Sequence, residues 1–273
     1  MQPIRHYLLA VQFFTRIPVT GRLAEWVGYS PAMLRASAAH LPGIGVLVGG
    51  LVALLSWGML QALPPGPFSP LVVAVLGTVF TVLLTGGFHE DGLADVADGL
   101  GGSYDRNRAL EIMKDSRVGA FGAMALVLAL LSKVSLLALL GSHGASLMAL
   151  ALLAAHAVSR TWPLLVIRLL PHVGDVAGSK SKPLADQISL GALAAGFLWC
   201  FCLVAGVFIA WPAMVSVASA GCVLGSAVAG SALAAAAMAW RLQRRLQGFT
   251  GDGLGATQQL GEIGFYLGLA LAL

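Results

Sequence analysis

The chain has 273 residues, of which 58% are hydrophobic and only 10% are charged, with a formal net charge of +4. Such a composition excludes an ordinary soluble domain and is typical of helices that satisfy their own backbone hydrogen bonds in lipid. The charge balance gives no sign of nucleic-acid binding, and the three cysteines lie in apolar runs without metal-site spacing. We predict one all-α membrane domain, residues 1–273, a polytopic bundle of about six to seven transmembrane helices.

Residues 1–41 are expected to form an arm that precedes the bundle of residues 42–273. Residues 4–19 are apolar but interrupted by Arg5 and Arg16, which favours an interfacial or re-entrant helix over a full span. Residues 21–40 are mixed in character and are interpreted as a cytoplasmic connector.

Six apolar runs follow, each long enough for a bilayer core that needs about 20 helical residues. A last segment, from near Gly255 to Leu273, crosses the membrane only if its helix includes Gln258, Gln259 and Glu262. The six predicted spans are residues 42–63, 70–88, 119–140, 146–170, 189–210 and 213–240.

The connections between the spans alternate in charge. Those near 64–69, 141–145 and 211–212 carry no Lys or Arg. The positive-inside rule assigns the basic connections to the cytoplasm. We therefore expect a bacterial inner-membrane protein whose N-terminus and charged loops, with the active-site residues among them, are cytoplasmic. Thirteen of the sixteen basic residues fall in the N-terminal arm and in residues 89–118, 171–188 and 241–254.

The loop of residues 89–118 concentrates the acids. Asp91, Asp95 and Asp98 are spaced i, i+4 and i+7, which would place them on one face of a helix. Two carboxylates about 6 Å apart repel by roughly 3 kcal/mol at an effective dielectric near 20. With Asp115 they are the predicted metal ligands, and Mg²⁺ is the hard cation that suits carboxylates and phosphate oxygens together. A solvated, charged loop is the alternative.

Basic residues follow these acids. Lys114 and Arg117 are candidates to bind a phosphorylated substrate, and anchoring to lipid headgroups is the alternative. Asp91, Asp95 and His89 are the candidate catalytic residues, although His89 could equally be a polar group at a helix start. One of the aspartates could act as a general base, and the sequence does not choose between them.

Ionisable residues also occur inside predicted spans. Lys133 lies in the middle of one, and Arg160 lies in another, one turn after His156. Such residues are candidates for substrate binding by default, and a structural polar network is the alternative.

A short phrase occurs twice. The pattern G-F-x-x-D-G-L appears at residues 87–93 and again at 248–254. Chance in a chain rich in Gly and Leu is one explanation, and two half-sites that face one substrate are the other. The second explanation makes Asp252 a candidate substrate-binding residue.

Several motifs together resemble the cobalamin synthase family, adenosylcobinamide-GDP ribazoletransferase. They are DGLADVADG and EIMKDSR within residues 86–122, FTRIPV at 14–19, PGIG at 42–45 and TGDGLGA at 250–256. One departure is Glu90, because the family pattern usually has an apolar residue there.

The resemblance implies a Mg²⁺-dependent transferase that joins adenosylcobinamide-GDP to α-ribazole or its 5′-phosphate. The products would be adenosylcobalamin, or its 5′-phosphate, and GMP. A CDP-alcohol-type phosphotransferase and, from a different class, a cation transporter remain as alternatives. Besides the lipid bilayer, a second copy of the chain or enzymes of the corrinoid pathway are candidate partners.

Overall fold

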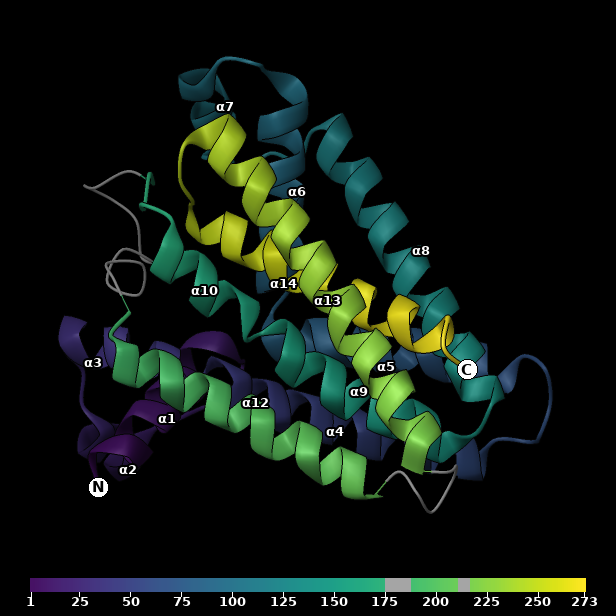
Figure 1. Ribbon diagram of the computed structural model, residues 1–273. Coiled ribbons are helices and arrows are strands. Elements are labelled where there is room, and N and C mark those ends of the chain that lie inside the picture. Colours follow the sequence, from purple (N-terminus) through teal and green to yellow (C-terminus); the bar gives the residue numbers. More distant parts are fainter. Residues whose placement is uncertain (175–187, 211–216) are drawn as a thin grey trace.

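The computed structural model describes residues 1–174, 188–210 and 217–273, and every regular element in these ranges is a helix (Figure 1). Five helices are long and apolar enough to cross a membrane, and a bent pair raises the count to six. The prediction of an all-α polytopic membrane protein is confirmed. The five are Pro31–Ala62, Ala120–Ser142, Ala145–Leu169, Leu190–Ala210 and Ala220–Leu246.

The N-terminal arm is more helical than its sequence indicated. The apolar run at 4–19 becomes α1 (Gln2–Phe14). The expected connector contains α2 (Gly21–Val27), α3 (Pro31–Ser37) and the 3₁₀ turn η1 (Ala38–His40), which leads directly into α4 (Leu41–Ala62). The overlooked signal is Ser30 before Pro31, because its hydroxyl accepts the N–H of Met33 as a helix N-cap.

A sharp bend separates α5 (Ser69–Thr85) from α6 (Phe88–Gly102), and the two helices meet at 90°. Gly86 and Gly87 form the bend, with φ of +72° and +70°, a region that residues with a Cβ rarely adopt. The bend turns an acidic helix away from an apolar one. Because carboxylates are costly in contact with lipid, we expect the acidic helix α6 to lie at the membrane edge rather than in the bilayer core.

The segment expected as a charged loop at 89–118 is thus largely helical, formed by α6 and then α7 (Arg106–Ile112). The remaining helices agree with the predicted spans to within a few residues at most ends. They are α8 (Ala120–Ser142), α9 (Ala145–Ser159), α10 (Trp162–Leu169), α12 (Leu190–Ala210), α13 (Val217–Leu246) and α14 (Gly251–Ala270).

Two boundaries differ. The span predicted at 146–170 is interrupted between α9 and α10, and α13 continues six residues beyond the predicted end at 240. The connection at 211–212 and most of the one at 171–188 lie outside the described residues. The last segment forms one helix, α14, that includes Gln258, Gln259 and Glu262. With these polar residues it is not among the helices apolar enough to cross a membrane.

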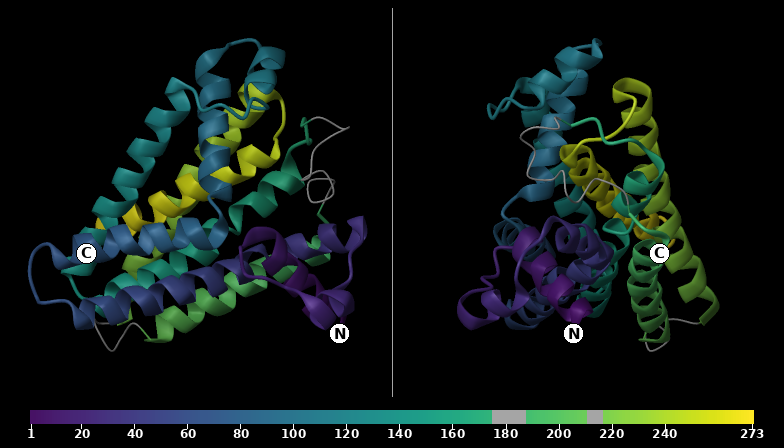
Figure 2. Two further views of the ribbon diagram at one scale, coloured as in Figure 1. Left: turned by 180° about the vertical axis from the view of Figure 1, so that it is seen from behind. Right: turned by 90° about the vertical axis from the view of Figure 1, so that its left-hand side faces the viewer.

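Helix α14 lies at the centre of the arrangement. It packs along α13, crosses α6 and also contacts α9 and α8 (Figures 1 and 2). Glycines permit the approach to α13, since a Cβ on Gly230 would lie 2.4 Å from the carbonyl oxygen of Gly264. On the other side of the bundle α4 packs against α9. The helices that carry the acidic residues are therefore fixed by the packed core.

Candidate active site

The two copies of the repeated phrase meet where α6 crosses α14. A Cβ on Gly92, in the first copy, would lie 2.7 Å from the carbonyl oxygen of Asp252, in the second. A Cβ on Gly255 would lie 3.2 Å from the Cα of His89. Glycine at these positions lets the backbones touch, and it brings Asp252 to the acidic face of α6.

Three carboxylates lie close enough at this crossing to interact electrostatically. Asp91 is exposed, whereas Asp95 and Asp252 are partly buried. Burial, and after it the negative charges of Asp252, Asp91 and Asp98 in that order, together raise the pKa of Asp95 to about 7. Of the predicted residues, the structure therefore brings together Asp91 and Asp95 of α6 with Asp252 of α14, which follows them by more than 150 positions in the chain.

The carboxylate of Asp98 forms hydrogen bonds with the backbone at the start of α8. Its two carboxylate oxygens accept the backbone N–H groups of Gly119, at 2.7 Å, and Gly122, at 2.8 Å. A Cβ on either glycine would lie within 2.5 Å of an Asp98 oxygen. The carboxylate thus fixes the first turn of α8 against α6. The predicted metal-binding role of Asp98 stays a prediction.

Asp115 and Arg117 form an exposed pair after α7. The Arg117 Nε donates to Asp115 Oδ1 at 2.9 Å, and hydrogen bonds from Arg117 lower the pKa of Asp115 to about 2. A pocket of about 500 Å³ opens beside this pair, between α7 and the start of α8. Lys114 is also exposed on this segment.

The two basic residues predicted inside spans are buried in a polar cluster. Lys133 Nζ lies 2.7 Å from Glu262 Oε1, and both side chains are only 1% exposed. Arg160, also 1% exposed, pairs its Nη1 with His156 Nδ1 at 2.8 Å. These contacts form a buried polar network, and the substrate-binding roles predicted for Lys133 and Arg160 stay predictions.

Residues of α14 complete this cluster. Gln258 Nε2 donates to Glu262 at 2.8 Å and to Ser159 Oγ at 3.1 Å, and the Tyr266 hydroxyl donates to Glu262 at 3.0 Å. Sequence analysis did not single out Glu262 as a site residue. The available signal was Lys133, because a lysine in the middle of a span requires a buried anion.

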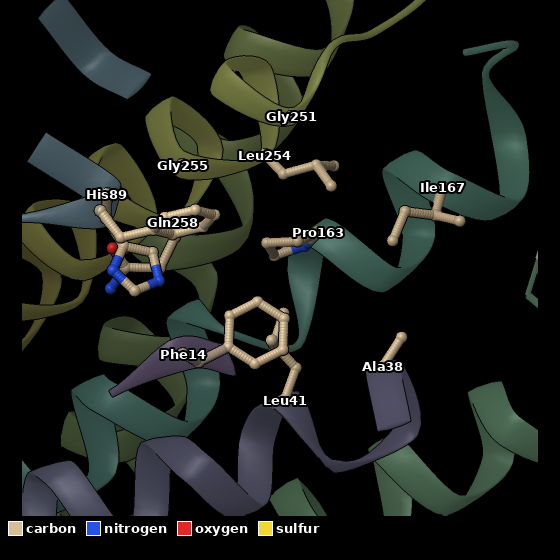
Figure 3. A pocket seen from close by; sticks show the side chains of 11 residues that line it. Phe14, Ala38, Leu41, His89, Pro163, Ile167, Gly251, Leu254, Gly255 and Gln258 are labelled. Atoms are coloured by element: carbon tan, nitrogen blue, oxygen red, sulfur yellow. The ribbon is translucent and has the colours of Figure 1, made fainter. Parts of the chain in front are cut away.

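Glu90, which departs from the family pattern, is also buried. Its Oε1 accepts the side-chain N–H of Gln259 at 2.9 Å, which adds a polar contact between α6 and α14. The neighbouring His89 is buried as well and lines a small apolar pocket beside Gln258, opposite Phe14 and Pro163 (Figure 3). The predicted catalytic role of His89 is not tested by this placement.

Comparison with known proteins decides the family. The family described as cobalamin-5-phosphate synthase matches residues 6–270. The chain belongs to this family. A relative from Albidiferax ferrireducens is 65% identical over the whole of this chain and 99% of its own length. A relative from Polaromonas sp. is 62% identical over all of this chain and 98% of its own length. One from Vibrio cholerae is 41% identical over 96% of this chain and 91% of its own length.

All three relatives are named adenosylcobinamide-GDP ribazoletransferase. No solved structure matches the chain. Membership of the family makes the protein an enzyme, a membrane-embedded transferase of cobalamin biosynthesis. The residues 86–122 and 250–256 that carry the resemblance are those that meet at the α6–α14 crossing and its continuation into α7 and α8.

Proposed function

We propose that the enzyme joins adenosylcobinamide-GDP to α-ribazole, or to its 5′-phosphate, and that the reaction depends on Mg²⁺. The products are adenosylcobalamin, or its 5′-phosphate, and GMP. The names of the relatives support the donor and the ribazole acceptor. The observation that carries the proposal is the gathering of Asp91, Asp95 and Asp252 at the crossing of α6 and α14.

The donor set at this crossing fits Mg²⁺. Among the described residues, no three His, Cys, Asp or Glu side chains form a group that could hold a metal ion by themselves. Mg²⁺ usually takes one or two carboxylates and completes its shell with substrate phosphates and water. Burial and the repulsion of neighbouring carboxylates together raise the pKa of Asp95 to about 7, and a bound cation would stabilise the charged forms of these carboxylates. Asp91 and Asp252 would hold it.

The reaction is a displacement at phosphorus. The ribose hydroxyl oxygen of the acceptor attacks the phosphorus next to cobinamide, and the P–O bond to GMP breaks. GMP leaves with the bonding electron pair, and the hydroxyl proton passes to a carboxylate. Asp95 is the candidate acceptor, because it is a partly buried carboxylate at the crossing whose pKa is raised by burial and by its acidic neighbours. Bound Mg²⁺ supplies positive charge to the phosphate oxygens.

The basic connections support a cytoplasmic N-terminus and cytoplasmic charged loops in a bacterial inner membrane. In this orientation the crossing, α7 and the start of α8 all face the cytoplasm. The nucleotide-bearing donor and the released GMP then stay on the side where soluble nucleotides are found.

Purified protein in liposomes tests the proposal. The assay supplies adenosylcobinamide-GDP and α-ribazole 5′-phosphate, with Mg²⁺ or with EDTA, and measures GMP and the cobalamin product. We expect product from the wild type, none with EDTA, and a rate at least 10²-fold lower in Asp95→Asn. Glu25→Gln, which changes an exposed acid of α2, is the matched control.

Absence of product from well-folded wild-type protein would overturn the proposal. Turnover of a CDP-linked alcohol without any corrinoid would then favour the phosphotransferase alternative, and cation flux across the liposome would favour the transporter. Full activity in Asp95→Asn would support the proposed reaction but show that Asp95 is not its general base.

A further inference from the structure

The pocket between α7 and the start of α8 has the size, charge and aromatic surface of a nucleotide site. We propose that this α7–α8 pocket binds the guanosine monophosphate part of the donor, an assignment that rests on the proposed function. Its volume is about 500 Å³, ample for a nucleotide. The residues on which the argument depends are Asp98, Arg108, Glu111, Asp115, Arg117 and Phe121.

The position of the pocket links it to the reacting carboxylates. Asp98, in its wall, follows Asp95 by three residues of α6, so the two side chains stand one helical turn apart, with Cβ atoms separated by about 5–6 Å. A nucleotide in the pocket can therefore direct its phosphate toward Asp95. Since the pocket is open, GMP can leave directly into water.

Phe121 offers a surface for the base. A Cβ on Gly101 would lie 2.5 Å from Cγ of the Phe121 ring, so the ring packs directly on the α6 backbone. The side chain is nevertheless 48% exposed. An aromatic ring that is held on one side and open to water on the other is suited to stack a nucleobase.

The charged residues around the ring are available to a ligand. Arg108 and Glu111 pair at 2.9 Å with side chains about 65% exposed, and Arg117 in its pair with Asp115 is 87% exposed. Exposed ion pairs are weak because water screens their charges, so a ligand can replace them. The guanidinium groups can then bind phosphate oxygens in a bidentate manner.

Glu111 is the better candidate to select guanine. Asp115 accepts hydrogen bonds from both the backbone and the side chain of Arg117, whereas within the described residues Glu111 accepts from the side chain of Arg108. A carboxylate accepts two parallel N–H bonds from the N1–H and the 2-amino group of guanine. Adenine has an acceptor in place of N1–H and lacks the 2-amino group, so Glu111 disfavours it.

Two other pockets among the described residues do not suit a nucleotide. The apolar pocket beside His89 has a volume of about 40 Å³, room for little more than water. The groove between α10 and α13, about 450 Å³, is lined mainly by alanine, leucine and tryptophan, with no charged side chain for a phosphate.

The test is GMP binding to the full-length protein in lipid nanodiscs with Mg²⁺, measured by calorimetry, with AMP as the comparison nucleotide. We expect Phe121→Ala to weaken GMP binding about tenfold, the effect of losing one base–aromatic stack. Glu111→Gln should lower the affinity for GMP to that for AMP. Phe68→Ala and Glu25→Gln, which alter an exposed aromatic and an exposed acid on other elements, should bind GMP like the wild type.

Binding of GMP by Phe121→Ala and Glu111→Gln with the wild-type dissociation constant would overturn the assignment, as would the absence of GMP binding to the wild type. Donor turnover with an unchanged KM for adenosylcobinamide-GDP in Phe121→Ala would reject the pocket and leave the proposed reaction intact. GMP binding that both variants weaken, in a protein without turnover, would support the pocket and reject the reaction.

Discussion

The buried Lys133–Glu262 pair makes a sharp prediction about stability. Both side chains are 1% exposed and the charged atoms are 2.7 Å apart. Their attraction is about 6 kcal/mol at an effective dielectric near 20, and much of it offsets the cost of removing both charges from water. Glu262→Gln keeps the size of the side chain and an oxygen that can accept the Tyr266 hydroxyl, so the main loss is the charge.

In Glu262→Gln, Lys133 must remain charged without a buried anion or give up its proton. We expect the variant to lose about 3–5 kcal/mol of stability, the cost of breaking a buried pair by removing one partner. Lys133→Met should lose less, because Arg160 and His156 remain near the Glu262 carboxylate. The double variant should recover part of the loss, because the charges of Lys133 and Glu262 are removed together and Arg160 keeps Glu90 as a nearby anion.

The measurement is reversible unfolding by SDS in mixed micelles, with all four proteins compared in a double-mutant cycle. Additive losses, with the double variant as unstable as the sum of the single variants, would refute the reasoning. So would an unchanged unfolding midpoint in Glu262→Gln.

Three further predictions concern the crossing and its surroundings. Because Asp95 must be unprotonated to accept a proton and its pKa is near 7, kcat/KM should fall as the pH is lowered from 8 to 6. More Mg²⁺ should shift the midpoint to lower pH, and a flat profile would contradict the role. Gly92→Ala should force α6 and α14 about 1 Å apart, since the added Cβ would lie 2.7 Å from the Asp252 carbonyl, and should lower kcat on the order of 10²-fold. Gly58→Ala, with nothing within 4 Å of its Cβ, is the matched control, and equal rates in the two variants would count against the crossing as the site. Asp98→Asn should cost about 1.5–3 kcal/mol in SDS unfolding, because the amide cannot accept both N–H bonds at the start of α8, and an unchanged midpoint would show that these bonds are not stabilising.

The amino-acid sequence determined much of this protein through local properties. The length and apolarity of each run predicted the helices, because a bilayer of fixed thickness sets the number of residues needed to cross it. The spacing of Asp91, Asp95 and Asp98 predicted one helical face, because helix geometry depends on neighbours along the chain. The short motifs predicted the family, because each of them contains within a few residues the groups that its part of the chemistry needs.

Tertiary structure decided which of these residues act together. Asp252 joins Asp95 through the contact of α6 with α14, whereas Asp98 caps α8, although all three appear alike in the sequence. Lys133, a candidate for substrate binding from the sequence, forms a buried ion pair with Glu262. Such partnerships depend on the packing of helices that are far apart in the chain, and on a 90° bend that two left-handed glycines permit. Periodicity specifies the face on which a residue lies, but only packing determines what that face meets.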